Sequence, residues 1–418
     1  MTRNRHASWA CLWVSLIIFV LTIVIVARST PQWTWDESWH QQTVGRLQMY
    51  GFGEQFLLNM PVATGPLYPV MQKILSPIFG YSLPTIRWMS VLFMALTLLT
   101  LVIFLRLKNH VFPPSALQLM ALPVLPCMTG LAMTESTTLF FFCLNLLTLS
   151  RAMEAAERGK RTHYLFAILA GLFLGITACG RQVFLASLAA LPILWLSRQK
   201  VFRLMSVLYG LSAIVLPAAL FLVWGGLASP GHENARPGTF SWLCLSLAIS
   251  QGALLYAIYD PSFILRDKRL SLLAVLIAPL VIVVLNRLGI IHLAQFVPLR
   301  AITSRHFPPF VDRIYQTAAT GFYFGLAALF IIFWTKTFIS VKDLTFRFYF
   351  TMALILLSTP GFIVHNYSSR YTMIAFPLFI LIQQLYLPSE TYWKAARLAL
   401  AGTVGIVVFM KYASLLPY

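Results

Sequence analysis

The stretch SWACLWVSLIIFVLTIVIVAR, residues 8–28, is apolar almost throughout and is long enough to cross a bilayer as one helix. A basic segment precedes it, as in a secretory signal peptide. However, Ala27-Arg28-Ser29 is a poor A-x-A cleavage site, and the apolar run exceeds the usual length of a signal peptide. We therefore expect residues 8–28 to form a retained first transmembrane helix.

The composition extends this expectation to the whole chain. Of its 418 residues, 59% are hydrophobic and 10% are charged, with a mean hydropathy of +0.78. Charged residues make up about a quarter of a soluble domain. The net charge of +19 does not indicate nucleic-acid binding, because the basic residues lie in short clusters between apolar runs. The cysteines show no CxxC spacing, so neither a zinc site nor a disulfide framework is indicated.

Apolar runs close to spanning length recur along the chain, which predicts an all-α polytopic membrane protein with about thirteen transmembrane helices. No internal repeat and no low-complexity linker interrupts them, so we expect one integral domain over residues 1–418. The runs are 8–28, 86–105, 114–132, 137–151, 163–180, 183–198, 204–224, 240–259, 271–291, 318–337, 346–364, 371–388 and 395–415.

The distribution of basic residues predicts the topology. If the N-terminus is cytoplasmic, the cytoplasmic loops and the N-terminal segment hold 19 of the 31 lysines and arginines in dense clusters. The positive-inside rule predicts this asymmetry. Segments 29–85, 132–136, 225–239, 292–317 and 365–370 then lie on the extracytoplasmic or lumenal side. The first of them is a large loop.

The first loop carries an acidic pair, Asp36 and Glu37, followed by His40 one helical turn later. Three tryptophans flank the pair, and Trp39 is the one that follows it. Beside a membrane surface and among indoles, a carboxylate has a raised cost of ionisation and becomes a candidate base. The alternative interpretation is an interfacial tryptophan belt with two acids at a helix N-terminus.

Further charges occur at the mouths of the predicted helices on the same side. The charges of Glu135 and Arg181 each cost free energy close to hydrocarbon, so each residue is expected to have a partner. By topology, the nearest plausible partners of Glu135 are Arg181 and Arg46. A Glu135–Arg181 ion pair would be either purely structural or, with Gln182, part of the lining of a polar cavity.

The segment 292–317 and its neighbour 365–370 are rich in cations. Arg305 and His306 stand in the first, and Arg370 stands in the second. The planar fork of arginine donates two parallel hydrogen bonds to a phosphate. The alternative is lipid headgroup binding, which is more usual on the cytoplasmic side. No GxGxxG, Walker A, HExxH, GxSxG or DxD element occurs, which argues against nucleotide use and against a zinc hydrolase.

Five ordered stretches resemble a known family, the GT-C glycosyltransferases that use lipid-phosphate sugars. Within that group the chain is most similar to the α-1,2-glucosyltransferases that add the terminal glucose to the dolichol-linked oligosaccharide. The stretches lie in the family's order along nearly the whole chain. They are Asp36–Gln42 with Met60–Tyr68 (D-E-x-x-H-x-x-Q and I-T-T-x-P-G-L-Y), Thr134-Glu135 (T-E), Arg181-Gln182 (R-Q), Ser304–Phe307 (N-R-H-Y) and Arg370–Pro377 (R-Y-x-x-x-P).

The resemblance implies a GT-C-like helical bundle and an inverting hexosyltransferase. The donor would be a dolichyl- or polyprenyl-phosphate hexose, with glucose and an α-1,2 linkage as the resemblance suggests. The acceptor would be a lipid-linked or cell-envelope glycan. No cofactor, metal or nucleic acid is expected, and the only other partners are membrane lipids. The membrane would be the endoplasmic reticulum or a bacterial inner membrane, with the active site on the lumenal or periplasmic side.

The expected roles follow from this chemistry. Asp36 would act as the base, Glu37 would orient the acceptor or tune Asp36, and His40 could form a hydrogen bond with either acid. Arg305, His306 and Arg370 would hold the leaving phosphate as its charge develops. Trp39, Glu135, Arg181 and Gln182 would position the substrates. The rival classes are a lipid or lipid-linked-sugar flippase and a polysaccharide polymerase or ligase. A flippase would place its polar groups near the bilayer midplane, commonly in two matching halves.

Overall fold

A computed structural model describes most of the chain, and its helices confirm the expected all-α membrane protein. Within the described residues it contains helices and turns but no strand. The described residues are 5–30, 32–34, 36–83, 85–107, 112–197, 199–232, 240–265, 268–290, 308–362, 368–387, 391–413 and 415.

Among the described residues, eight helices are long and apolar enough to cross a membrane, fewer than the thirteen predicted. They are α1 (Arg5–Arg28), α5 (Thr85–Arg106), α7 (Thr134–Glu157), α10 (Lys200–Trp224), α11 (Trp242–Tyr259), α13 (Lys268–Arg287), α15 (Pro309–Ser340) and α19 (Tyr392–Tyr412). A ninth apolar helix, α8 (Thr162–Ala178), is 17 residues long.

The other four predicted runs are helical but broken, and each contains a proline at or beside the break. Proline lacks the amide hydrogen of a helical turn and its ring clashes with the preceding turn. The pieces are η1 (Pro113–Ala121) with α6 (Leu125–Gly130), η2 (Gln182–Ala190) with α9 (Pro192–Trp195), α16 (Leu344–Ser358) with η4 (Thr359–Phe362), and α17 (Arg370–Met373) with α18 (Phe376–Tyr386). Within the described residues, the predicted apolar runs therefore outnumber the continuous helices of spanning length.

The chain forms two compact units. Unit 1 contains residues 1–237, 343–356 and 373–418, and unit 2 contains residues 238–342 and 357–372. The prediction of one integral domain stays a prediction.

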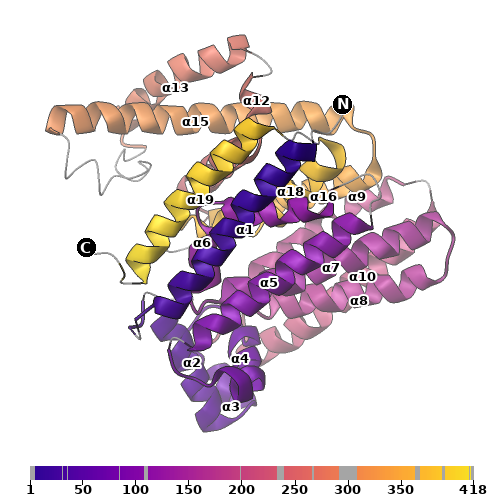
Figure 1. The fold of residues 1–418 in the computed structure, drawn as a ribbon. Coiled ribbons are helices and arrows are strands. Elements are labelled where there is room, and N and C mark those ends of the chain that lie inside the picture. Colours follow the sequence, from indigo (N-terminus) through magenta and orange to yellow (C-terminus); the bar gives the residue numbers. More distant parts are fainter. Residues whose placement is uncertain are drawn as a thin grey trace. The chain divides into compact units, whose positions relative to one another are not determined.

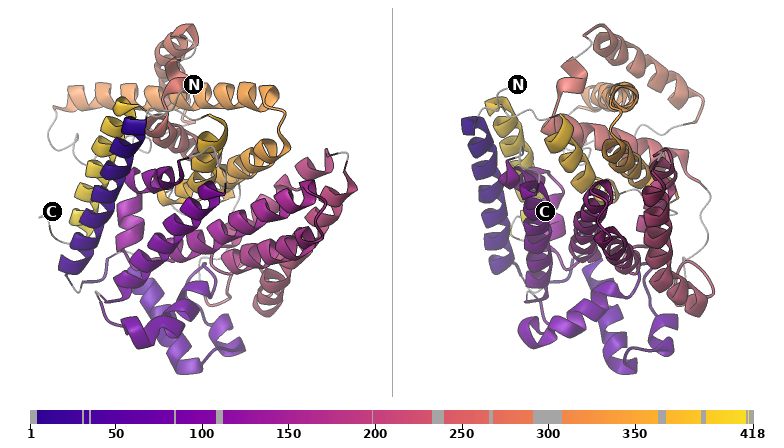
Figure 2. Two further views of the ribbon diagram at one scale, coloured as in Figure 1. Left: turned by 45° about the vertical axis from the view of Figure 1, so that its right-hand side comes forward. Right: turned by 90° about the vertical axis from the view of Figure 1, so that its right-hand side faces the viewer.

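In unit 1, helices α1 and α19 lie side by side and run in the same direction (Figures 1 and 2). The Cys11 thiol is 4.0 Å from the Thr391 carbonyl oxygen at their N-terminal ends. At their C-terminal ends Ile25 and Phe409 belong to one apolar cluster. Parallel packing places both N-terminal ends on one side, which is what the topology predicted from charge requires.

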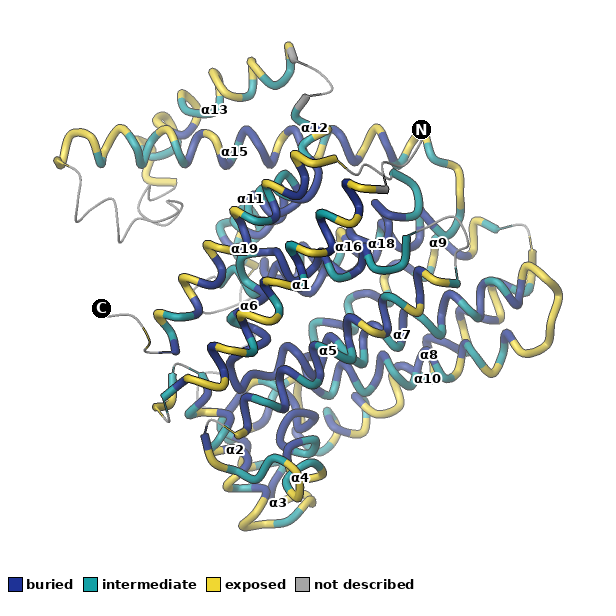
Figure 3. The backbone as a smooth tube through the Cα atoms, in the orientation of Figure 1, coloured by how far each residue is buried: buried dark blue, intermediate teal, exposed yellow. Residues whose placement is uncertain are grey.

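Helices α5, α7, α8 and α10 form a second group of packed helices in unit 1. Figure 3 shows α5 and α7 as largely buried. Helix α8 packs against both α7 and α10. Its Gly171 and Gly175 face the backbone of α10 around Ala213, so that the two helices approach closely, as small residues four apart allow.

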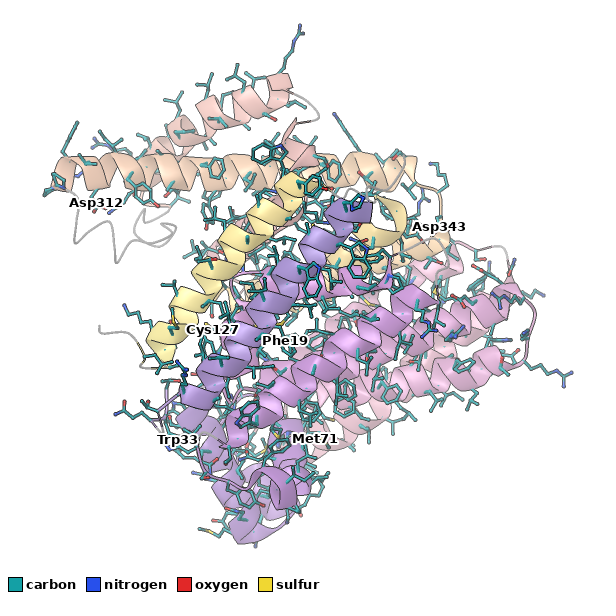
Figure 4. All side chains as sticks on the ribbon, viewed as in Figure 1. Phe19, Trp33, Met71, Cys127, Asp312 and Asp343 are labelled. Atoms are coloured by element: carbon teal, nitrogen blue, oxygen red, sulfur yellow. The ribbon has the colours of Figure 1, made fainter. Side chains whose placement is uncertain are left out.

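Three short helices of the segment 29–85 cover one end of unit 1, namely α2 (Glu37–Tyr50), α3 (Glu54–Leu58) and α4 (Leu67–Phe79) (Figure 1). The segment after α10 joins them there. The Trp224 indole donates to the Leu57 carbonyl at 2.9 Å, and the Gly231 amide donates to the Leu58 carbonyl at 3.0 Å. Figure 4 labels Trp33 and Met71 in this region.

Unit 2 consists mainly of α11, α13 and α15, with the short α12 (Ser262–Leu265). Helices α13 and α15 pack along each other, and α11 packs against α15. The side chains of α13 are otherwise largely exposed, as expected of a helix that faces lipid.

Candidate functional site

A buried ion pair joins the first helix of the 29–85 segment to helix α5. The Arg87 guanidinium donates to both oxygens of Glu37, from Nε at 2.9 Å and from Nη2 at 2.7 Å. Neither side chain is exposed. The geometry is the two-point fork that makes arginine–carboxylate pairs strong.

Glu37 also accepts hydrogen bonds from two other segments. The Ala132 amide donates to it at 2.7 Å, and Thr34 donates from its amide at 3.0 Å and from its hydroxyl at 2.8 Å. Arg87 in turn donates to the carbonyl oxygens of Thr30, at 3.2 Å, and Gln32, at 3.0 Å. The pair therefore ties Thr30, Gln32 and Thr34 to α5 and to the turn that precedes α7.

Glu37 is held in its ionised form. Burial acts to raise its pKa, but the hydrogen bonds and charge of Arg87 and the amides of Ala132 and Thr34 outweigh burial and lower the pKa below the usual value. A carboxylate that already accepts five hydrogen bonds is poorly suited to abstract a proton. Its geometry is that of an anchor.

The adjacent carboxylate, Asp36, is placed differently. It is half-buried at the N-terminus of α2, where the helix dipole favours a negative charge. Trp33 and Trp39, the two described tryptophans that flank it, are 39% and 52% exposed. Of the two acids, Asp36 is the one presented toward the surface.

His40 connects this end of α2 to α4. Its amide donates to the Asp36 carbonyl at 3.0 Å, and its ring centroid lies 5.4 Å from that of Tyr68. Both His40 and Tyr68 are buried. The segment that the sequence marked by Asp36, Glu37 and His40 is thus packed directly on the Met60–Tyr68 stretch.

Glu135 and Arg181 form the ion pair that the sequence indicated. Arg181 Nη2 contacts Glu135 Oε1, and Arg181 Nε donates to the Thr134 hydroxyl at 3.3 Å. Glu135 is fully buried and Arg181 is nearly so. Because Ala132 bonds to Glu37, the four residues Ala132–Glu135 link the two ion pairs.

The Met60–Tyr68 stretch contacts the turn at Arg181 through backbone. The Gly65 amide donates to the Gly180 carbonyl at 3.1 Å, and the Leu67 amide donates to the Cys179 carbonyl at 3.2 Å. A Cβ at Gly65 would overlap the Cys179 carbonyl oxygen. Gln182 also reaches this stretch and donates to the Ala63 carbonyl at 2.9 Å. Three of the five stretches that carry the family resemblance therefore meet in unit 1.

The predicted phosphate-binding residues are Arg305, His306 and Arg370. Arg305 and His306 lie outside the described residues. Arg370 is half-buried at the start of α17, in unit 2, where its guanidinium carbon lies 5.3 Å from the centre of the Tyr371 ring.

Arg87 was missed as a candidate in the sequence analysis. The available signal was an arginine at the start of an otherwise apolar run, which is expensive unless it is paired. Its partner is 50 residues away along the chain, so sequence spacing could not identify it. Tyr68 was quoted only as the end of a motif.

No group of three histidine, cysteine or acidic side chains in the described part of the chain could hold a metal ion. Comparisons of the chain with protein-family models, with curated proteins and with solved structures find no match in any of the three. The function therefore has to be argued from the site.

Proposed function

We propose that this protein is an inverting glycosyltransferase that transfers a hexose from a polyprenyl or dolichyl monophosphate to a hydroxyl group of a glycan acceptor. One observation carries the proposal, namely the different settings of two adjacent carboxylates. Glu37 is buried and its carboxylate accepts five hydrogen bonds, whereas Asp36 is half-buried between exposed indoles.

This arrangement suits a base that works at a membrane surface. The Glu37–Arg87 pair fixes the first turn of α2, and so fixes Asp36 with little freedom to move. A positioned base removes the proton from the acceptor hydroxyl as the bond to phosphate breaks. Exposed tryptophans beside Asp36 offer flat faces on which a sugar ring can stack. Both features are matched to a glycan acceptor.

The donor explains why such an enzyme would be built from membrane helices. Its lipid tail stays in the bilayer while the sugar phosphate reaches the surface. Arg305, His306 and Arg370 are proposed to bind the phosphate, because cations stabilise a leaving monophosphate as its charge develops. Their role follows from the sequence.

The test is a transfer assay with the purified full chain in vesicles. Radiolabelled polyprenyl-phosphate glucose and its mannose counterpart are offered as donors, with membrane glycolipid extract as acceptor. We expect label to appear in a glycan product with at least one donor. Movement of the labelled donor between leaflets without any product would contradict the proposal and would favour a flippase.

A further inference from the structure

Three hydroxyl groups beside the two ion pairs are buried and have no hydrogen-bond partner among the described residues. They belong to Thr64, Tyr68 and Thr137. A buried hydroxyl without a partner costs about 1–3 kcal/mol, and such groups are rare enough in native proteins to need an explanation.

The three hydroxyls lie on segments that pack against one another. Thr64 precedes Gly65, whose amide bonds to Gly180, and a Cβ at Gly180 would meet Thr138, the neighbour of Thr137. Tyr68 packs with Phe140 and Phe141, which follow Thr137 by one turn of α7 and so share its face. Tyr68 and Thr137 thus lie on two helices that pack against each other, α4 and α7, and Thr64 lies in the segment that leads into α4.

The surroundings of these hydroxyls carry no net charge. Glu37 is neutralised by Arg87, and Glu135 is neutralised by Arg181. Burial, and then the charges of Glu37 and Glu135, raise the pKa of Tyr68 above its ordinary value. Its hydroxyl therefore stays protonated and can both donate and accept a hydrogen bond.

Such a site suits a neutral polyol better than an anion. A phosphate would meet two carboxylates, Glu37 and Glu135, whose arginines are already engaged. A sugar hydroxyl, by contrast, can donate and accept simultaneously, as the three side-chain hydroxyls require. Sites built to bond a substrate hydroxyl discriminate strongly against ligands that lack it.

We infer that Thr64, Tyr68 and Thr137 form a subsite that binds the ring hydroxyls of a neutral hexose. This inference rests on the proposed function, because it assigns part of the same site. It makes Tyr68 a determinant of sugar specificity rather than of phosphate binding. Since the hydroxyls are closed off from solvent, the ligand has to displace the irregular segment Met60–Pro66, which lies between α3 and α4.

The test is binding, so that its outcome does not depend on transfer. The purified full chain is kept in a detergent without a sugar headgroup, because a glycosidic detergent would compete. Methyl glycosides of glucose, mannose and galactose are added, with inorganic phosphate as the anionic probe. Thermal unfolding reports binding, because a ligand specific to the folded state stabilises that state. Hydrogen exchange of residues 60–66 reports the movement of the segment.

The variants are Tyr68→Phe and Thr137→Val, which each remove one hydroxyl. Tyr349→Phe is the matched control, because Tyr349 is also buried but packs against Phe104 near the other end of α5. We expect one glycoside to stabilise the wild type and to alter exchange at 60–66. Tyr68→Phe should lower the affinity for that glycoside by about 10-fold, which corresponds to the loss of one neutral hydrogen bond. Tyr349→Phe should leave the affinity unchanged.

Two results would overturn the inference. One is that no glycoside stabilises the wild type, which would leave only water for these hydroxyls. The other is that Tyr68→Phe, shown to fold by its cooperative unfolding, binds the glycoside as well as the wild type does. Failure of the transfer assay together with Tyr68-dependent glycoside binding would contradict the proposed enzyme and leave the subsite standing.

Discussion

Arg87 donates two hydrogen bonds to the carboxylate of Glu37, from Nε at 2.9 Å and from Nη2 at 2.7 Å, and both side chains are completely buried. A buried pair of this kind is weak evidence for stability, because taking two charges out of water costs much of what their attraction returns. What the pair does is fix a position. It fastens the first turn of α2, and with it Asp36, to α5 and to the turn before α7.

The first prediction concerns the dependence of Glu37 and Arg87 on each other. Glu37→Gln and Arg87→Met should each destabilise the protein by about 3–5 kcal/mol, because each leaves an uncompensated buried partner. The double variant should lose much less free energy of unfolding than the two single variants lose together. A double-mutant cycle of unfolding in detergent measures the coupling.

Arg151→Ala is the control for this cycle. Arg151 pairs with Glu154 at 3.4 Å, but its side chain is 40% exposed. Removing an exposed pair should cost about 0–1 kcal/mol. Additive losses for Glu37 and Arg87 would show that the pair is not coupled.

The second prediction is the pH dependence of stability. The pKa of Glu37 is lowered in the folded state below its ordinary value of 4.5. The unfolded chain therefore binds the proton more readily, and the contribution of Glu37 to stability is present above about pH 4.5 and is lost as the pH falls through the folded-state pKa. The melting temperature of the wild type, minus that of the Glu37→Gln/Arg87→Met double variant, should decrease as the pH is lowered below about 4.5. A constant difference would contradict the lowered pKa.

The third prediction concerns the contact between residues 65 and 179. Gly65→Ala should destabilise the protein by about 1–3 kcal/mol, because the added methyl group meets a backbone carbonyl that cannot turn aside. Gly45→Ala is the matched control, because Gly45 lies within α2 and a Cβ there meets nothing within 4 Å. It should stabilise α2 by about 0.5–1 kcal/mol. Equal effects of the two variants would be incompatible with the contact.

The fourth prediction separates the roles of the two adjacent acids. Asp36→Asn should fold normally and lower hexose transfer by about 10² to 10⁴-fold, because an amide cannot accept the proton. Glu37→Gln should lower the amount of folded protein more than it lowers turnover per folded molecule. Transfer rate and melting temperature are measured on the same preparations. Substantial turnover by Asp36→Asn would remove Asp36 as the base.

The fifth prediction tests topology. Ser38 lies in α2, and Thr162 is exposed at the start of α8. If the charge asymmetry sets orientation, a membrane-impermeant maleimide should label Ser38→Cys and Thr162→Cys from opposite sides. A variant with its five native cysteines replaced provides the background. Labelling of both positions from one side would reject the predicted orientation.

The sequence by itself determined that this is a helical membrane protein, because apolar runs of spanning length have few alternatives to a helix in lipid. It also indicated the Glu135–Arg181 pair, because a charge close to hydrocarbon needs a partner and the predicted topology left few candidates. It marked the Met60–Tyr68 stretch and the turn at Arg181, which the fold brings into contact. The membrane character came from composition, the ion pair from the local cost of a charge, and the Met60–Tyr68 stretch from its resemblance to a family motif.

Only the tertiary structure decided which helices are continuous and which of two neighbouring acids is anchored. Pro123 and Pro192 lie in runs that are apolar enough to span, so hydropathy did not reveal the breaks. Asp36 and Glu37 are equivalent in the sequence. They differ because Arg87 and Ala132, 50 and 95 residues beyond Glu37, converge on one carboxylate and leave the other at the surface. Hydrogen-bond partners so distant along the chain are set by packing, which no local pattern encodes.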